Sequence, residues 1–153
     1  MTLTNRGEKT LPFGGGFHPW FPRTRGTSVA FSATGYFTQS LDHLPQTYVQ
    51  MLEGEAFELP EGWVNTAFSG WDGSARVIWP EAGRGIEITA EAPLRTLMVY
   101  SPSADCGYVC LEPVSHSVDA HNREGPGHVR PEALAPGQSL ELAARFAPFQ
   151  ITI

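Results

Sequence analysis

The sequence is poor in basic residues and has no long apolar runs, and each shortage excludes a class of protein. Ten basic residues are set against sixteen acidic ones, and the basic residues are scattered, giving a formal net charge of −6. A nucleic-acid interface needs a basic patch or stripe, so we expect no nucleic-acid partner. A membrane span needs 18 or more consecutive apolar residues, which the chain does not contain, so we expect no membrane partner.

Cysteine is also scarce, with only Cys106 and Cys110 in the chain. If residues 107–112 are extended, the two cysteines lie about 13 Å apart at roughly 3.3 Å per residue. A disulfide needs Cα atoms within about 7 Å, so we expect no intrachain bridge. The first six residues lack the apolar core of a signal peptide. These features together predict a cytoplasmic protein.

What the chain does contain indicates one folded unit. Its 153 residues are enough for a single domain with a core, and we expect one domain over residues 1–153. A content of 41% hydrophobic and 17% charged residues excludes global disorder. The 16 glycines and 13 prolines predict frequent turns.

Short stretches of β-forming residues recur between these turns, a pattern typical of an all-β sandwich. We expect a short helix over Gln46–Glu53 and a long loop over His116–Pro131, and Gly35 could mark a β-bulge. The expected strands are Thr2–Thr4, Thr10–Phe13, Ser28–Gln39, Thr66–Phe68, Ala75–Trp79, Ile86–Ala90, Leu94–Tyr100, Gly107–Glu112 and Ser139–Phe146.

The most distinctive stretch is Phe13–Pro22, which places His18 between three glycines and an aromatic block. The glycines permit close approach of another segment, and Pro19 favours an extended His18. Far along the chain, Glu112 follows three apolar residues at the end of an expected strand. We hypothesise that His18 and Glu112 form an acid/base pair, because burial would raise the pKa of Glu112 towards that of a general base.

Simpler interpretations of these residues stay open. Glu112 could be a partnered structural carboxylate and His18 a surface histidine, and Asp72 is first a turn former and second a site residue. Trp79 falls on an apolar strand face, whereas Trp20 and Trp71 lie beside turns and could line a cleft.

Metal and nucleotide chemistry find little support in the sequence. Cys106, Cys110, His116 and His121 could suggest zinc, but a strand would hold the two cysteines apart, so we expect no metal. The remaining histidines, His43 and His128, suggest no role. The chain has no phosphate loop, G-x-S-x-G elbow or dinucleotide fingerprint.

Four motifs occur in the order found in one family. The segment from Asn5–Gly7 through Pro12 to Gly16–Phe21 resembles the "TN…P…GFHPYF" stretch of bacterial aldose 1-epimerases, which are galactose mutarotase-like proteins. Phe68–Gly73 resembles the family's "FTGWDG", Val109–His116 its "VCLEPVSH" and Leu134–Ser139 its "LAPGES". Together the matches extend over nearly the whole chain.

The resemblance implies a galactose-mutarotase-type β-supersandwich that interconverts the α and β anomers of a free aldose such as an aldohexose. Glu112 would be the general base on the anomeric hydroxyl and His18 the general acid on the ring oxygen, without metal or organic cofactor. The substrate-binding residues would be Asn65, Trp20, Trp71 and Asp72, with Asn65 standing where many members have an aspartate.

Members of this family are about twice as long, and the chain resembles their C-terminal half. The resemblance therefore implies an incomplete supersandwich, with a missing half that would carry another sugar-binding histidine and an arginine. Uncovered sheet edges and apolar surface predict self-association, unless that missing half covers them. The alternatives are a non-catalytic carbohydrate-binding fragment and a purely structural β-sandwich.

Overall fold

The computed structural model describes residues 1–151, and nearly all of its regular structure is β-strand. The two short 3-10 helices are η1 (Pro80–Ala82) and η2 (Ala104–Cys106). The strands are β1 (Thr2–Thr4), β2 (Leu11–Phe13), β3 (Trp20–Pro22), β4 (Ser28–Phe31), β5 (Gly35–Gln39), β6 (Pro45–Gln50), β7 (Val64–Ser69), β8 (Ser74–Trp79), β9 (Arg84–Ala90), β10 (Thr96–Ser101), β11 (Tyr108–Val114), β12 (Glu132–Leu134), β13 (Ser139–Glu141) and β14 (Ala144–Gln150).

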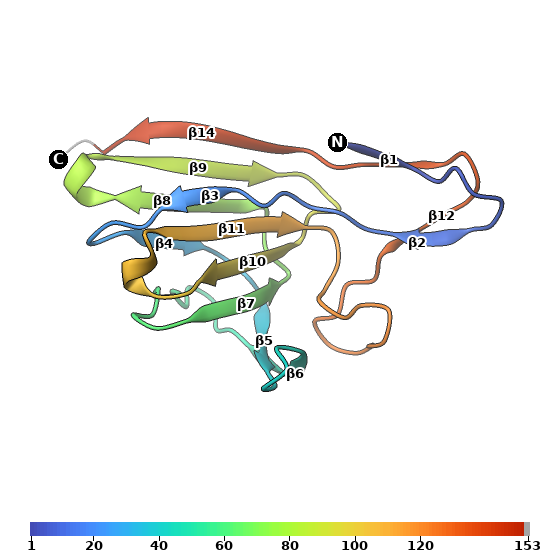
Figure 1. Ribbon diagram of the computed structural model, residues 1–153, viewed down its shortest axis with the longest axis horizontal. Coiled ribbons are helices and arrows are strands. Elements are labelled where there is room, and N and C mark those ends of the chain that lie inside the picture. Colours follow the sequence, from blue (N-terminus) through green and yellow to red (C-terminus); the bar gives the residue numbers. More distant parts are fainter. Residues whose placement is uncertain (152–153) are drawn as a thin grey trace.

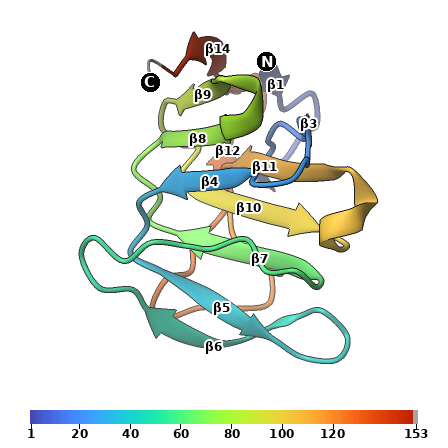
Figure 2. The same cartoon turned by 90° about the vertical axis from the view of Figure 1, so that its left-hand side faces the viewer.

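Two antiparallel sheets form the body of the molecule. The larger has the strand order β3-β11-β10-β7-β5-β6, and the smaller has the order β14-β9-β8-β4. Two further pairs, β1 with β13 and β2 with β12, extend from one end of the body (Figure 1). Figure 2 shows β5 and β6 together at one end of the molecule and β14 at the other. The expectation of an all-β, galactose-mutarotase-like sandwich is confirmed.

The main core lies between the two sheets. It joins buried side chains of the larger sheet, including Phe68, Leu97 and Leu111, to Val77 and Ile88 of the smaller one. Alternation along each strand produces this division, because successive side chains of a strand point to opposite faces of its sheet. A second cluster of leucines lies at the base of the extending strands: Leu94, Leu134, Leu140 and Leu142.

The expected helix over Gln46–Glu53 is wrong. Residues 45–50 form β6, the last strand of the larger sheet, which pairs with β5. Thr47, Tyr48 and Val49 are β-formers, and Tyr48 packs on Phe37 across the strand pair. This pairing outweighs the weak local preference for a helix.

Two long expected strands are each divided in the structure. Residues 28–39 form β4 and β5, which belong to different sheets, and Gly35 is the first residue of β5 rather than a bulge. A side chain at Gly35 would meet Tyr48 and the carbonyl of Val49 at 2.5 Å, so glycine is needed for close strand packing. Residues 139–146 are likewise divided between β13 and the start of β14, and β3 and β12 were not expected.

Other expectations for the chain have mixed outcomes. Both cysteines are free, as expected. No helix among the described residues is long and apolar enough to cross a membrane. The expected single domain over 1–153 includes two residues outside the described range, and it stays a prediction, as does the cytoplasmic location.

Candidate functional site

His18 and Glu112 are brought together by the pairing of two segments. Trp20 of β3 pairs with Cys110 of β11, and Gly16 forms an isolated bridge with Val114. Three residues separate the paired positions on each segment, and the middle ones are His18 and Glu112. The two residues therefore lie opposite each other, although they are 94 positions apart in the sequence.

The glycine stretch allows this close pairing. A side chain at Gly16 would come within 2.5 Å of the Pro113 carbonyl and of the Val114 side chain. The backbone continues the contact on both sides, because Phe17 N–H donates to Pro113 O at 3.0 Å and Ser115 N–H donates to Gly15 O at 2.9 Å. The segment before His18 is thus attached to the end of β11 by its own backbone.

The two side chains are in direct contact. His18 Nε2 lies 3.1 Å from Glu112 Oε1, and the side chains are 54% and 14% exposed. Burial raises the pKa of Glu112, and the neighbouring His18 charge lowers it by less. A carboxylate with a raised pKa beside an accessible imidazole can exchange protons with a bound molecule, which is the chemistry of a general acid/base pair.

Aromatic side chains extend the site along the same face. Trp20 stacks on His18 with ring centroids 5.5 Å apart and an interplanar angle of 19°, and it also contacts Tyr108 at 4.3 Å. Tyr100 lies 6.3 Å beyond Tyr108. Trp20 was expected at the site, but the two tyrosines were missed. The position of Tyr108 at the site could have been predicted from the sequence. It precedes Glu112 by four residues, and alternation along a strand places both side chains on one face of the sheet.

Asn65 also belongs to this face of the larger sheet. It lies opposite Tyr100, which in turn lies opposite Cys110, so the three side chains form a row across β7, β10 and β11. The backbone carbonyl of Asn65 accepts a hydrogen bond from the Gln39 amide. The Asn65 side chain is therefore positioned two strands away from β11, on the side where Glu112 is found.

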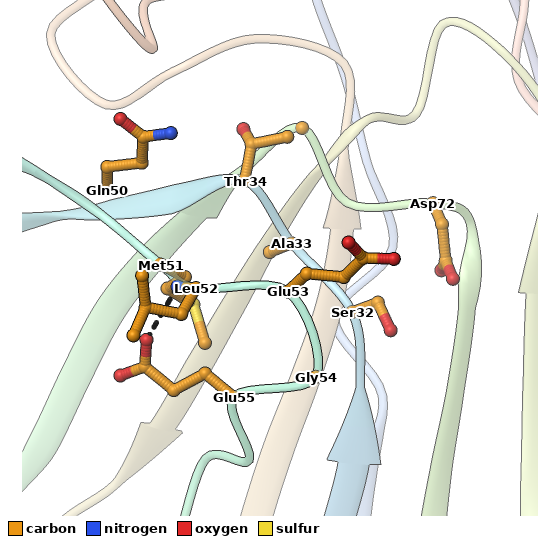
Figure 3. Close-up of a pocket in the computed structure, with 11 residues that line it drawn as sticks. Ser32, Ala33, Thr34, Gln50, Met51, Leu52, Glu53, Gly54, Glu55 and Asp72 are labelled. Atoms are coloured by element: carbon orange, nitrogen blue, oxygen red, sulfur yellow. Dashed lines mark hydrogen bonds between the residues drawn. The ribbon is translucent and has the colours of Figure 1, made fainter.

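Trp71 and Asp72 do not join this group. Trp71 is fully buried in the core between the sheets, and its Nε1 donates to Ser74 O at 2.7 Å. Its expected role in contacting sugar is not supported, because no face of its ring reaches the surface. Asp72 caps a turn, since its carboxylate accepts the N–H of Ser74 at 2.8 Å. Asp72 lines a different cavity of about 480 Å³, together with Thr34 and Glu53 (Figure 3).

Three of the other histidines, His116, His128 and His43, have local partners. His116 packs against Gly14, and its Nδ1 lies 3.3 Å from Ser115 Oγ, while burial lowers its pKa. His128 contacts the Phe37 ring at 4.5 Å, burial again lowering its pKa, and His43 contacts Trp63 at 4.9 Å.

Among residues 1–151, one group of side chains has donor atoms close enough to hold a metal ion. His18, Cys110 and Glu112 each offer one ligand atom, and these atoms lie within 4.8 Å of one another. The set suggested by the sequence, in which Cys110 joined Cys106, His116 and His121, differs from this group. Burial raises the pKa of the Cys110 thiol to about 12, so the free thiol is protonated and weakly reactive.

Comparison with known proteins gives consistent matches. The model of one family, described as aldose 1-epimerase, matches residues 1–147. The uncharacterized protein YphB of Escherichia coli (strain K12) is 39% identical over 150 residues, covering 91% of this chain and 51% of that protein. The chain therefore spans about half the length of the curated relative it matches.

Solved structures agree with this result. A crystal structure of a candidate aldose 1-epimerase from Escherichia coli K12 has a TM-score of 0.86 and 31% identity, covering 98% of this chain and 55% of that one. A galactose mutarotase-like protein from Clostridium acetobutylicum has a TM-score of 0.77 at 16% identity, covering 98% of this chain and 51% of that one, and supports the fold alone.

Proposed function

The chain belongs to the aldose 1-epimerase family, and on that premise we propose that it interconverts the α and β anomers of a free aldose. The observation that carries this proposal is the 3.1 Å contact between His18 and Glu112 on an accessible sheet face. Glu112 is the proposed general base and His18 the proposed general acid. Neither role requires a cofactor.

The proposed reaction moves one proton to the base and one from the acid. Glu112 takes the proton of the anomeric hydroxyl O1, and His18 gives a proton to the ring oxygen O5. The C1–O5 bond breaks with its electron pair going to O5, and a carbonyl forms between C1 and O1. Rotation about C1–C2 turns the other face of the aldehyde towards O5, and ring closure with the roles reversed gives the other anomer.

The arrangement of the pair suits this reaction. O1 and O5 are bonded to the same carbon, so the acid and the base must stand side by side. Residues opposite each other on neighbouring antiparallel segments have Cβ atoms about 4.5–5.5 Å apart, which provides such a pair. A sugar bound with both oxygens at the pair would replace the direct His18–Glu112 contact with two separate hydrogen bonds.

The residues around the pair have the properties of a sugar-binding surface. Trp20, which is 59% exposed, offers an apolar ring to the C–H face of a pyranose. The amide of Asn65 can donate to and accept from hydroxyl groups but carries no charge. A neutral aldohexose is therefore the proposed substrate class.

A second candidate function is carbohydrate binding without turnover. It is favoured by the length comparison, because the chain covers 51% of its curated relative and 55% of a solved one. A sugar-binding residue in the part of these relatives that the chain does not match would have no counterpart in it. Binding then depends on Trp20 and Asn65, and turnover depends on whether His18 and Glu112 suffice.

Polarimetry of freshly dissolved α-D-glucose and α-D-galactose tests the proposal. The protein should accelerate mutarotation, and Glu112→Gln should reduce the acceleration about 10²–10⁴-fold, the usual contribution of a general base. Glu141→Gln is the matched control, because Glu141 is an exposed strand glutamate on β13. A folded wild type that binds sugar without accelerating mutarotation would support the second function.

A further inference from the structure

Three side chains of different chemistry converge at the centre of the site. A ring nitrogen of His18, the Sγ of Cys110 and a carboxylate oxygen of Glu112 all lie within 4.8 Å of one another. Cys110 and Glu112 are two residues apart on β11 and point to the same face, and His18 lies opposite Glu112. The proposed epimerase reaction uses only two of the three.

The third side chain, Cys110, has no part in the proposed reaction. Cys110 is fully buried, and among residues 1–151 its Sγ has no hydrogen-bond partner. The other cysteine differs, because Cys106 Sγ donates to Tyr108 O at 3.1 Å. The Cys110 sulfur faces a carboxylate and an imidazole, and it could bind a metal ion without breaking a hydrogen bond within the protein.

We propose that His18, Cys110 and Glu112 bind a thiophilic divalent cation of the zinc class. Thiolate, imidazole and carboxylate are the ligands found in zinc sites, whereas magnesium and calcium prefer oxygen alone. The thiolate and the carboxylate together balance the two charges of the cation. The thiol proton is released to solvent when the cation binds.

The distances allow this coordination with small movements. Zinc bonds of about 2.3 Å to sulfur and 2.0–2.2 Å to nitrogen and oxygen place tetrahedral ligand atoms roughly 3.3–3.6 Å apart. His18 Nε2 and Glu112 Oε1 are 3.1 Å apart, already close to this spacing. The half-exposed His18 side chain can rotate to complete the site. Its open side leaves a fourth position for water.

A bound cation and a sugar would exclude each other. The cation would occupy the lone pairs of the same nitrogen and carboxylate oxygen that the proposed reaction uses for proton transfer. The consequence is reversible inhibition by zinc. The binding inference itself rests on the geometry of three side chains and does not depend on the epimerase proposal.

Cobalt(II) titration of the tag-free chain tests the site directly, because a thiolate ligand gives a near-ultraviolet charge-transfer band. We expect the band at one equivalent, its loss when zinc displaces cobalt, and no displacement by magnesium or calcium. In Cys110→Ser the band should disappear, and zinc affinity measured by calorimetry should fall about 100-fold or more, since even outer-shell changes cost 10–100-fold. Cys106→Ser is the matched control and should keep both.

Several results would overturn the inference. They are the absence of stoichiometric zinc binding to the wild type, a charge-transfer band that survives in Cys110→Ser, and a band that is lost in Cys106→Ser. If Cys110→Ser does not fold, His18→Ala, which changes a largely exposed side chain, should weaken zinc binding about 10-fold or more. Inhibition of mutarotation by zinc is measured in a separate experiment. A protein without mutarotase activity would contradict the epimerase proposal, and the cobalt and zinc titrations would still decide whether the metal site exists.

Discussion

Trp20 and Trp71 have the same side chain and both lie beside turns, but their surroundings differ completely. Trp20 is 59% exposed on the face that carries His18 and Glu112, whereas Trp71 is fully buried in the core. We predict that Trp71→Ala lowers the free energy of unfolding by about 3–5 kcal/mol, the usual cost of removing a buried aromatic ring. Urea unfolding followed by circular dichroism measures this loss.

Trp20→Ala serves as the contrasting variant. We expect its unfolding free energy to stay within about 0.5 kcal/mol of the wild type, because the ring is mostly exposed. Its sugar affinity should decrease, since the proposed stacking surface is removed. The opposite pattern, with Trp20 stabilising the fold and Trp71 controlling sugar affinity, would contradict the assignment of the two rings.

Glu112 should make both activity and stability depend on pH. Its pKa in the folded protein is raised above the ordinary value of 4.5, mainly by burial. The mutarotation rate should therefore fall as pH decreases through this raised pKa, because the base becomes protonated. Glu112→Gln should lack this limb of the profile in polarimetry.

The contribution of Glu112 to stability changes with pH in the opposite direction from its contribution to the mutarotation rate. A raised folded pKa means that the folded state favours the protonated carboxyl, so this stability is present below 4.5 and is lost as pH rises through the folded pKa. Glu112→Gln should consequently gain unfolding free energy relative to the wild type at neutral pH and gain less in acid. Urea unfolding of the variant and the wild type at neutral and at acidic pH tests this prediction. An equal difference in unfolding free energy at both pH values would contradict it.

At the residue scale, the sequence predicted the pairing of distant residues where both belonged to a distinctive motif. His18 and Glu112 followed from distinctive motifs, and the structure brings them into contact. Trp71 was misjudged because a position beside a turn does not reveal which side of the sheet a ring faces. Tyr100 was missed because its neighbour relation to Tyr108 depends on strand register, which no local pattern contains.

At the scale of elements, the glycine segment determines where His18 lies. We predict that Gly16→Ala lowers stability by about 1–3 kcal/mol, the usual cost of overpacking, and lowers activity more strongly by shifting the segment away from β11. The new Cβ would meet the Pro113 backbone oxygen at 2.5 Å, and a backbone atom cannot rotate away. Gly62→Ala is the control, because a Cβ there meets nothing within 4 Å.

Unfolding in urea and polarimetry together measure this effect. A Gly16→Ala protein with unchanged rate and unchanged stability would show that the segment tolerates a wider spacing. A loss of activity larger than the loss of folded protein is the expected result, because the proposed acid/base pair needs its spacing even when the sheet survives.

Element types were predictable where alternation was clear, as in β8 and β9, and where a short apolar run lay between turns, as in β11. The Gln46–Glu53 region was misassigned because β6 is an edge strand whose exposed residues, such as Gln46 and Thr47, weaken the alternating pattern. The division of residues 28–39 between two sheets was also invisible, since both halves have strand composition and only tertiary packing separates them.

At the scale of the whole molecule, several large apolar side chains are exposed. Leu41 is 99% exposed, Leu52 78% and Trp20 59%, and the curated relative contains about as much chain again. We predict that the protein self-associates at micromolar concentration, which light scattering over a dilution series measures. Sulfate should strengthen the association, because it increases the burial of apolar surface. A monomer at every concentration and salt level would contradict this prediction.

The fold class was predictable from recurring short strands and from the resemblance to a known family. The assignment of strands to the two sheets was not, because sheet order depends on pairings between distant segments such as β3 with β11. Such pairings carry no local signature in a single sequence.

The pairing of Gly16 with Val114 and of Trp20 with Cys110 has a consequence for how this protein can evolve. Side chains alternate along both segments, so inserting one residue between Gly16 and His18 would turn the imidazole to the opposite face of the sheet. Deleting one residue would do the same. The segment can therefore change in length only by an even number of residues if His18 is to stay on the same face as Glu112. A homologue that gained or lost a single residue here would lose the His18–Glu112 contact while keeping every other residue of the motif.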